Sequence, residues 1–77
     1  MRHFYIALRS PEAIREFVSV AGVQPFGVCV ENEGKSVNGK SLMGLFCLDP
    51  GKVHQVSMEC TQEEYDHFYR LTEQFRP

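Results

Sequence analysis

Four short stretches of the chain predict strands, and in the first two of them apolar and polar side chains alternate, the spacing of strands that bury one face. In the first stretch, residues 3–8, Phe4, Ile6 and Leu8 share a face. The other stretches are residues 26–30, 35–38 and 53–59, whose expected inward residues are Phe26, Val28, Val30, Val56 and Met58. Residues 32–34, Asn-Glu-Gly, predict a hairpin loop of about three residues between the second and third strands.

Helical spacing and start signals predict three helices. The first begins at Ser10 as N-cap, with a proline and a glutamate in its first turn, and stops at Gly22. The second covers residues 41–48, and the third opens on a capping box at residues 61–64 and reaches about residue 74. The apolar stripes are Ile14, Phe17, Val18 and Ala21 in the first helix and Phe68, Leu71 and Phe75 in the last.

The resulting order is β-α-β-β-α-β-α in a single domain over residues 1–77, an α/β (α+β) arrangement with helices covering the apolar face of one small sheet. A net charge of −2 gives no electrostatic case for nucleic acid or an anionic membrane, and no apolar run approaches a membrane span. The three cysteines lack metal-site spacing and predict reduced, mostly buried thiols in a cytoplasmic protein. We expect no metal and no cofactor.

Residues 34–45, Gly-Lys-Ser-Val-Asn-Gly-Lys-Ser-Leu-Met-Gly-Leu, resemble a signature of HPr, the small histidine phosphocarrier of the bacterial sugar phosphotransferase system. In that family a Lys-Ser pair leads into a short apolar helix that docks partners. The resemblance implies the HPr-like open-faced sandwich, a four-stranded antiparallel sheet with three helices on one face. The order of elements over nearly the whole chain agrees with it.

The second hallmark of that family, a histidine at the start of the first helix, has no counterpart here. The alignment with the family places Ser10 at the histidine position and Glu12 at the position of an arginine. A serine hydroxyl is a weak nucleophile without an adjacent base, and Glu12 would repel a phosphoryl group. Ser10 is either a helix cap alone or a relic regulatory site. His3, His54 and His67 lie in other predicted elements, and we expect each on the surface or half buried.

Ser41 is either an N-cap alone or an N-cap that is also a regulatory phosphorylation site, the second reading resting on the resemblance. A short helix cannot bury all its apolar side chains, so we predict that Leu45 and Leu48 point inward. The expected partner-binding surface is then Leu42, Met43 and Phe46. The alternative is that Phe46 folds down onto the edge of the core.

Three functions follow. The favoured one is a cytoplasmic, non-phosphotransferring regulatory or interaction domain related to sugar transport, whose partner is a kinase or a transcriptional regulator. The second is a phosphocarrier with an unusual acceptor, His3 or Ser10, and the third is a structural or oligomerisation domain, a monomer or weak dimer. No nucleophile–base pair or phosphate-cradling loop occurs in the sequence, so we do not expect an enzyme.

Overall fold

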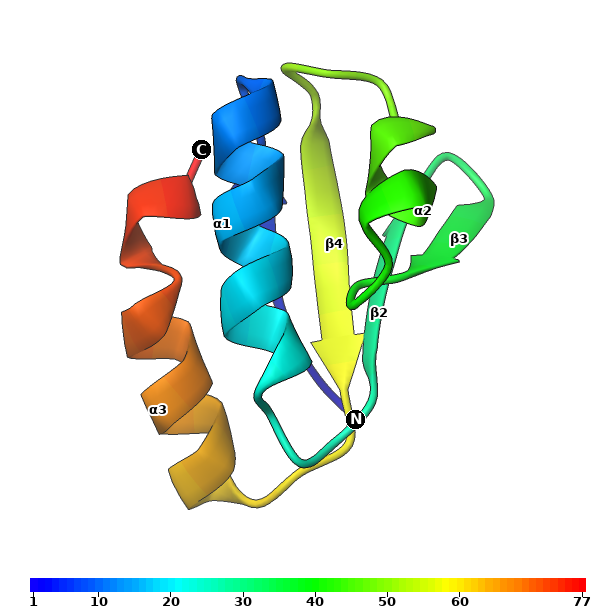
Figure 1. Ribbon diagram of the computed structural model, residues 1–77. Coiled ribbons are helices and arrows are strands. Elements are labelled where there is room, and N and C mark those ends of the chain that lie inside the picture. The colour runs from blue at the N-terminus through cyan, green and yellow to red at the C-terminus, as the bar shows by residue number, and fades with distance from the viewer.

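The computed structural model describes residues 1–77 as one sheet with three helices on one face (Figure 1). The sheet is antiparallel, with strand order β1-β4-β2-β3, so that β1 and β3 are its two edges. This confirms the predicted architecture and its order. The elements are β1 (Arg2–Ala7), α1 (Pro11–Gly22), β2 (Val28–Asn32), β3 (Lys35–Asn38), α2 (Leu42–Phe46), β4 (Val53–Met58), α3 (Gln62–Leu71) and a 3-10 turn (Glu73–Phe75).

The inner face of the sheet carries the alternating apolar residues of the strands. In the β1–β4 register Phe4 lies opposite Val56, and in the β2–β4 register Val30 lies opposite the same residue. All three are buried, and the opposite sheet face has no helix over it. Phenylalanines fill the space between the inner face of the sheet and the helices. Phe68 of α3 contacts Phe4, Phe17 and Phe26 there.

Side-chain caps begin all three helices, as the sequence predicts. The hydroxyls of Ser10, Ser41 and Thr61 each accept a hydrogen bond from the backbone N–H three residues later. At Thr61 the capping box is complete, because the Glu64 side chain accepts the Thr61 N–H at 2.9 Å. Each bond satisfies a donor that a helix end leaves free.

The end of α3 differs from the prediction. The α-helix stops at Leu71, and the chain continues into the 3-10 turn Glu73–Phe75. Leu71, the last residue of α3, is 40% exposed, whereas Thr72, four residues after the buried Phe68, is fully buried. The Thr72 hydroxyl is satisfied there by the Phe68 carbonyl at 2.9 Å.

Two further predictions need correction. The β2–β3 hairpin closes through a two-residue turn, Glu33-Gly34, because Asn32 pairs directly with Lys35. Both turn residues have positive φ, 50° and 83°, the requirement of a type I′ turn. The second helix, α2, ends at Phe46 rather than Leu48, since Cys47 is its C-cap.

Candidate functional site

The start of α1 is built as a helix cap. Ser10 adopts an extended backbone, and its Oγ accepts the Ala13 N–H at 3.1 Å. Pro11 follows as the first helical residue and Glu12 lies in the first turn, where its carboxylate is 3.8 Å from the Arg15 guanidinium. The hydroxyl at the predicted carrier position is therefore already engaged, and the nearest ion pair is a solvent-exposed one on the same helix.

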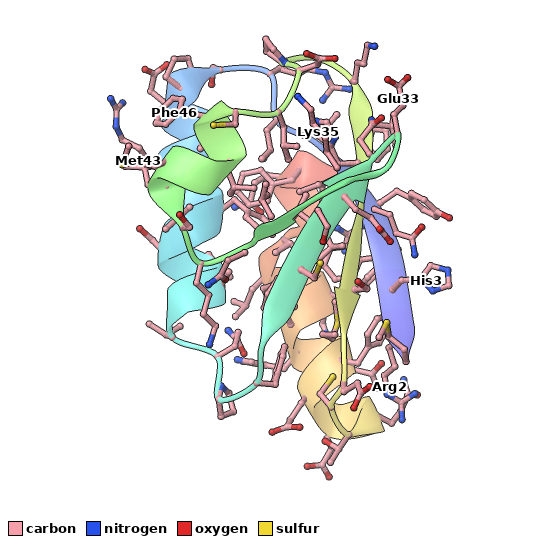
Figure 2. All side chains as sticks on the ribbon, turned by 90° about the vertical axis from the view of Figure 1, so that its right-hand side faces the viewer. Arg2, His3, Glu33, Lys35, Met43 and Phe46 are labelled. Atoms are coloured by element: carbon pink, nitrogen blue, oxygen red, sulfur yellow. The ribbon has the colours of Figure 1, made fainter.

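No histidine lies at this helix start. His3 lies on β1 and points away from the helices on the open face of the sheet (Figure 2). His67 is exposed on α3. His54 is only 3% exposed, which corrects the expectation of a surface or half-buried residue. Its Nε2 is 3.1 Å from the Asp49 carbonyl oxygen and its Nδ1 is buried without a partner, so this ring ties the loop after α2 to β4.

Ser41 is held at the start of α2 by a compact loop. Its N–H donates to the Asn38 carbonyl at 3.0 Å, and its Oγ accepts the Gly44 N–H at 3.1 Å. Gly39 donates its N–H to the Val28 carbonyl at 2.7 Å, close enough that an added Cβ would lie 2.6 Å from Val28 Cγ1. The loop thus requires glycine at position 39 and fixes where α2 begins.

The Lys40 side chain is anchored away from Ser41 by a hydrogen bond to another loop. Its ammonium donates to the Gln24 carbonyl at 2.7 Å, which joins this loop to the connection between α1 and β2. Its N–H donates to the Asn38 side-chain oxygen at 2.9 Å. Lys35 remains as an exposed cation on β3.

The apolar side chains of α2 divide as the sequence predicts. Leu45 and Leu48 are buried, whereas Leu42, Met43 and Phe46 are 38%, 82% and 46% exposed. Met43 and Phe46 point outward on the same side of the molecule (Figure 2). Phe46 therefore does not fold onto the core edge. Cys47, next to it, is also exposed.

The cysteines are free, but they are not the buried thiols that the sequence indicated. Cys47 is exposed, and Cys29 and Cys60 are partly buried. Burial raises the pKa of the Cys60 thiol, and the Glu64 carboxylate adds to the effect while Arg2 opposes it. The arrangement at α1 and α2 contains no nucleophile beside a base, and no three acidic, histidine or cysteine side chains converge as metal ligands.

One cluster was missed by sequence reasoning. Tyr65 and Tyr69 of α3 stack at 5.7 Å between ring centroids, and the Arg76 guanidinium lies over the Tyr69 ring at 3.7 Å. Their spacing of four residues on one helix face was a visible signal. Their position beside β1 was not visible, because it depends on how α3 packs.

Comparison with known proteins gave matches only among solved structures. No protein-family model matches the chain, and no curated protein matches it. A crystal structure titled HPr-C-His, from Thermoanaerobacter tengcongensis, is similar with a TM-score of 0.75 and 26% identity, over 95% of this chain and 92% of that one. A crystal structure of a phosphocarrier protein HPr from Bacillus anthracis str. Ames is similar with a TM-score of 0.64 and 21% identity, over 91% of this chain and 94% of that one.

The two matches cover nearly all of both chains. None of the helices here combines the length and apolar character that crossing a membrane requires. Four antiparallel strands, three helices on one face and this near-complete overlap confirm the resemblance at the level of the fold: the chain has the HPr-like fold of the phosphocarrier proteins.

Proposed function

We propose that this protein is a regulatory or interaction domain of HPr type that does not transfer phosphoryl groups and is not an enzyme. Its role would relate to the bacterial sugar phosphotransferase system, in the cytoplasm. The observation that carries the proposal is a contrast between two helix starts. Ser10, at the predicted carrier position of α1, is an engaged cap, while α2 presents an exposed apolar surface of Leu42, Met43 and Phe46.

The chemistry at the start of α1 argues against a relay. A carrier must accept a phosphoryl group and release it readily, and the phosphate ester of a serine is far less reactive than a phosphoramidate. The Ser10 hydroxyl has no base beside it, so it remains a weak nucleophile. A phosphate on it would also meet the Glu12 carboxylate within the same turn, and like charges at such distances disfavour each other.

The surface of α2 supports a docking role. Met43 and Phe46 are a flexible and an aromatic side chain, types that suit an adaptable protein contact. Three neighbouring apolar residues left exposed on a five-residue helix form a patch that burial in this chain does not explain. We propose a kinase or a transcriptional regulator as the partner.

Ser41 is the proposed regulatory site. This residue is partly exposed at the N-terminus of α2, next to Leu42 of the proposed docking surface. A phosphate at this position would meet the positive end of the helix and the free N–H groups of its first turn. It would therefore change the charge of the docking surface without unfolding the helix.

A phosphorylation assay tests whether the protein has lost the ability to carry a phosphoryl group. The protein is incubated with the first enzyme of the phosphotransferase system and phosphoenolpyruvate, and its intact mass is then measured. A phosphocarrier with a histidine at the helix start is the positive control. We expect the control to gain a phosphoryl group and this protein to gain none. Phosphate mapped to His3, Ser10 or another histidine would refute the proposal and favour the carrier function.

Binding measurements with a purified HPr kinase test the docking surface. We expect Phe46→Ser and Met43→Ser to weaken binding, because each removes apolar area from the contact. Val23→Ser is the matched control, since Val23 is an exposed apolar residue at the end of α1. Equal effects of all three substitutions would show that α2 is not the docking surface.

A further inference from the structure

The free edge of β1 differs from the other edge of the sheet. β1 pairs only with β4, over six residues and in continuous register. It contains no proline, lysine or bulge, the devices with which proteins usually protect an edge strand. The other edge, β3, is shorter and lies beside α2 (Figure 1). β1 is therefore the edge that is open to pairing with a further strand.

Two hydrogen bonds fix which backbone groups point outward from β1. The Leu8 carbonyl accepts the Gly51 N–H, from the loop that precedes β4. The His3 carbonyl instead accepts the Tyr65 hydroxyl, at 3.0 Å. Because backbone groups alternate in direction along a strand, the odd-numbered residues of β1 direct their N–H and C=O groups to the free edge. None of these groups faces a neighbouring strand, and the His3 carbonyl is bonded by a helix side chain, the Tyr65 hydroxyl.

A groove of about 430 Å³ runs beside this edge, between β1 and α3. Its walls are largely aromatic, and the rings of Tyr5 and Tyr69 are 48% and 42% exposed. The Phe4 ring meets the Tyr65 and Tyr69 rings edge-on at 6.0 and 5.5 Å between centroids. The residues that line the groove are His3, Phe4, Tyr5, Tyr65, Tyr69, Arg76 and Pro77.

Two partly buried cations flank the groove, and neither has a carboxylate partner. Arg2 donates to the Cys60 carbonyl and the Gln62 side chain. The Arg76 guanidinium lies over both the Phe4 ring and the Tyr69 ring, at 4.7 and 3.7 Å from their centroids, and it donates to backbone carbonyls at the end of α3. All the ion pairs of the protein lie elsewhere, on residues 12, 15, 33, 49 and 52.

Both guanidinium groups act on the Tyr65 hydroxyl at this edge. Burial raises the pKa of the Tyr65 hydroxyl, Tyr69 and Asp66 add to this, and both Arg76 and Arg2 oppose it. The guanidinium groups of Arg2 and Arg76 thus both lower the pKa of Tyr65, and the one carboxylate that opposes them is that of Asp66. A ligand that brings negative charge would complement them, whereas a second copy of β1 would bring its own Arg2 and Arg76 and repel.

We propose that the β1 edge and the groove beside it form a second binding site, which accepts an extended, acidic peptide segment of a partner protein as a fifth strand. Backbone N–H groups of the segment bond the outward carbonyls of β1, and one of them replaces the Tyr65 hydroxyl at His3. Apolar side chains enter the aromatic groove, and carboxylates pair with Arg2 and Arg76. Strand addition to a sheet edge with side-chain pockets alongside is an established mode of peptide recognition.

This site lies at the opposite end of the sheet from α2, so it does not depend on the function proposed for that helix (Figure 1). A partner held at β1 would leave Met43 and Phe46 accessible. The protein would then be able to bring two partners together, one at each edge of the sheet.

The test uses the whole protein and three blocked six-residue peptides, matched in length to β1. In the first, glutamate alternates with valine. The second replaces glutamate by lysine, and the third keeps glutamate but carries N-methyl groups on the backbone amides that would pair. We expect only the first to bind, with amide chemical-shift changes at residues 2–7 and 62–76.

Substitutions test the charge contacts. Arg2→Gln and Arg76→Gln should each weaken binding of the acidic peptide about three- to tenfold, the effect of one solvent-screened charge contact. Arg15→Gln removes the same charge from α1 and should leave binding unchanged. Since Arg76 also holds the end of α3, Arg76→Lys, which keeps the charge, and circular dichroism distinguish lost contact from lost structure.

Several results would overturn the proposal. They are absence of binding by the acidic peptide at millimolar concentration, equal binding of the lysine peptide, equal binding of the N-methylated peptide, and shift changes located at α2. Concentration-dependent dimerisation of the protein alone through β1 would also overturn it, since the edge would then serve a second copy.

Discussion

The loop before α2 leads to a prediction about a single methyl group. Gly39→Ala would place its Cβ 2.6 Å from Val28 Cγ1, 3.1 Å from Val28 Cβ and 3.2 Å from the Val28 carbonyl oxygen. Contacts this short do not persist, so either the loop or Val28 must move. Val28 has little freedom, because it is a β-branched core residue on a strand paired on both sides.

The magnitude follows from two opposing effects. Overpacking a well-filled core costs about 1–3 kcal/mol. Replacing glycine by alanine restricts the unfolded chain, which returns about 0.4–1 kcal/mol. We therefore expect a net loss of about 1–2 kcal/mol in the free energy of unfolding. In a domain of this size each kcal/mol lowers Tm by about 4–8 °C.

Urea denaturation followed by circular dichroism measures this loss, with Gly27→Ala as the control. An added Cβ at Gly27 meets no atom within 4 Å, so that variant should be neutral or slightly stabilised. Because Gly39 lies two residues before Ser41, Gly39→Ala should also shift the amide resonances of residues 41–45. Equal stability of the two variants would show that the close approach to Val28 does not constrain this loop.

Three other predictions concern α1 and α3. The double variant Ser10→His with Glu12→Arg should gain a phosphoryl group from the first enzyme of the phosphotransferase system, and intact mass measures this gain. A folded variant that gains none would show that the site lacks more than the acceptor histidine. Thr61→Ala should lose about 1 kcal/mol of stability in urea, because it removes half of the capping box. Burial raises the folded pKa of Tyr65, so the stability it contributes should be complete below its unfolded pKa of about 10 and lost as pH rises through the folded pKa. Tyr65→Phe should flatten that dependence, and an unchanged slope in urea midpoints against pH would contradict it.

Local patterns predicted much of the fold. Alternation placed Phe4 and Val56 on the inner sheet face, since a strand's two faces follow directly from its period. The helix caps at Ser10 and Thr61 were predictable from the sequence because they depend on residues within one turn. The exposure of Met43 was predictable from geometry alone, because a short helix has one inward face and too many apolar residues for it.

The errors occurred where distant residues decide the outcome. His54 is buried because the Asp49 carbonyl, in a loop of irregular backbone, provides its hydrogen-bond partner. Leu71 is exposed because the buried side of α3 passes from Phe68 to Thr72 and then to Phe75 of the 3-10 turn, and a polar residue gives no sign of this in the sequence. Arg76 lies over Phe4, 72 positions earlier in the sequence, and no periodicity connects residues on different elements.

The starts of α1 and α2 are held by different contacts. Ser10 is fixed by a bond within its own helix, and Glu12 forms its ion pair with Arg15 on that helix. The position of α2 depends instead on Gly39 against Val28 and on Leu45 in the core. A change of acceptor at the start of α1 therefore alters chemistry at one place without moving the exposed face of α2, so an HPr-like chain is able to lack a relay and still present the same apolar residues to solvent.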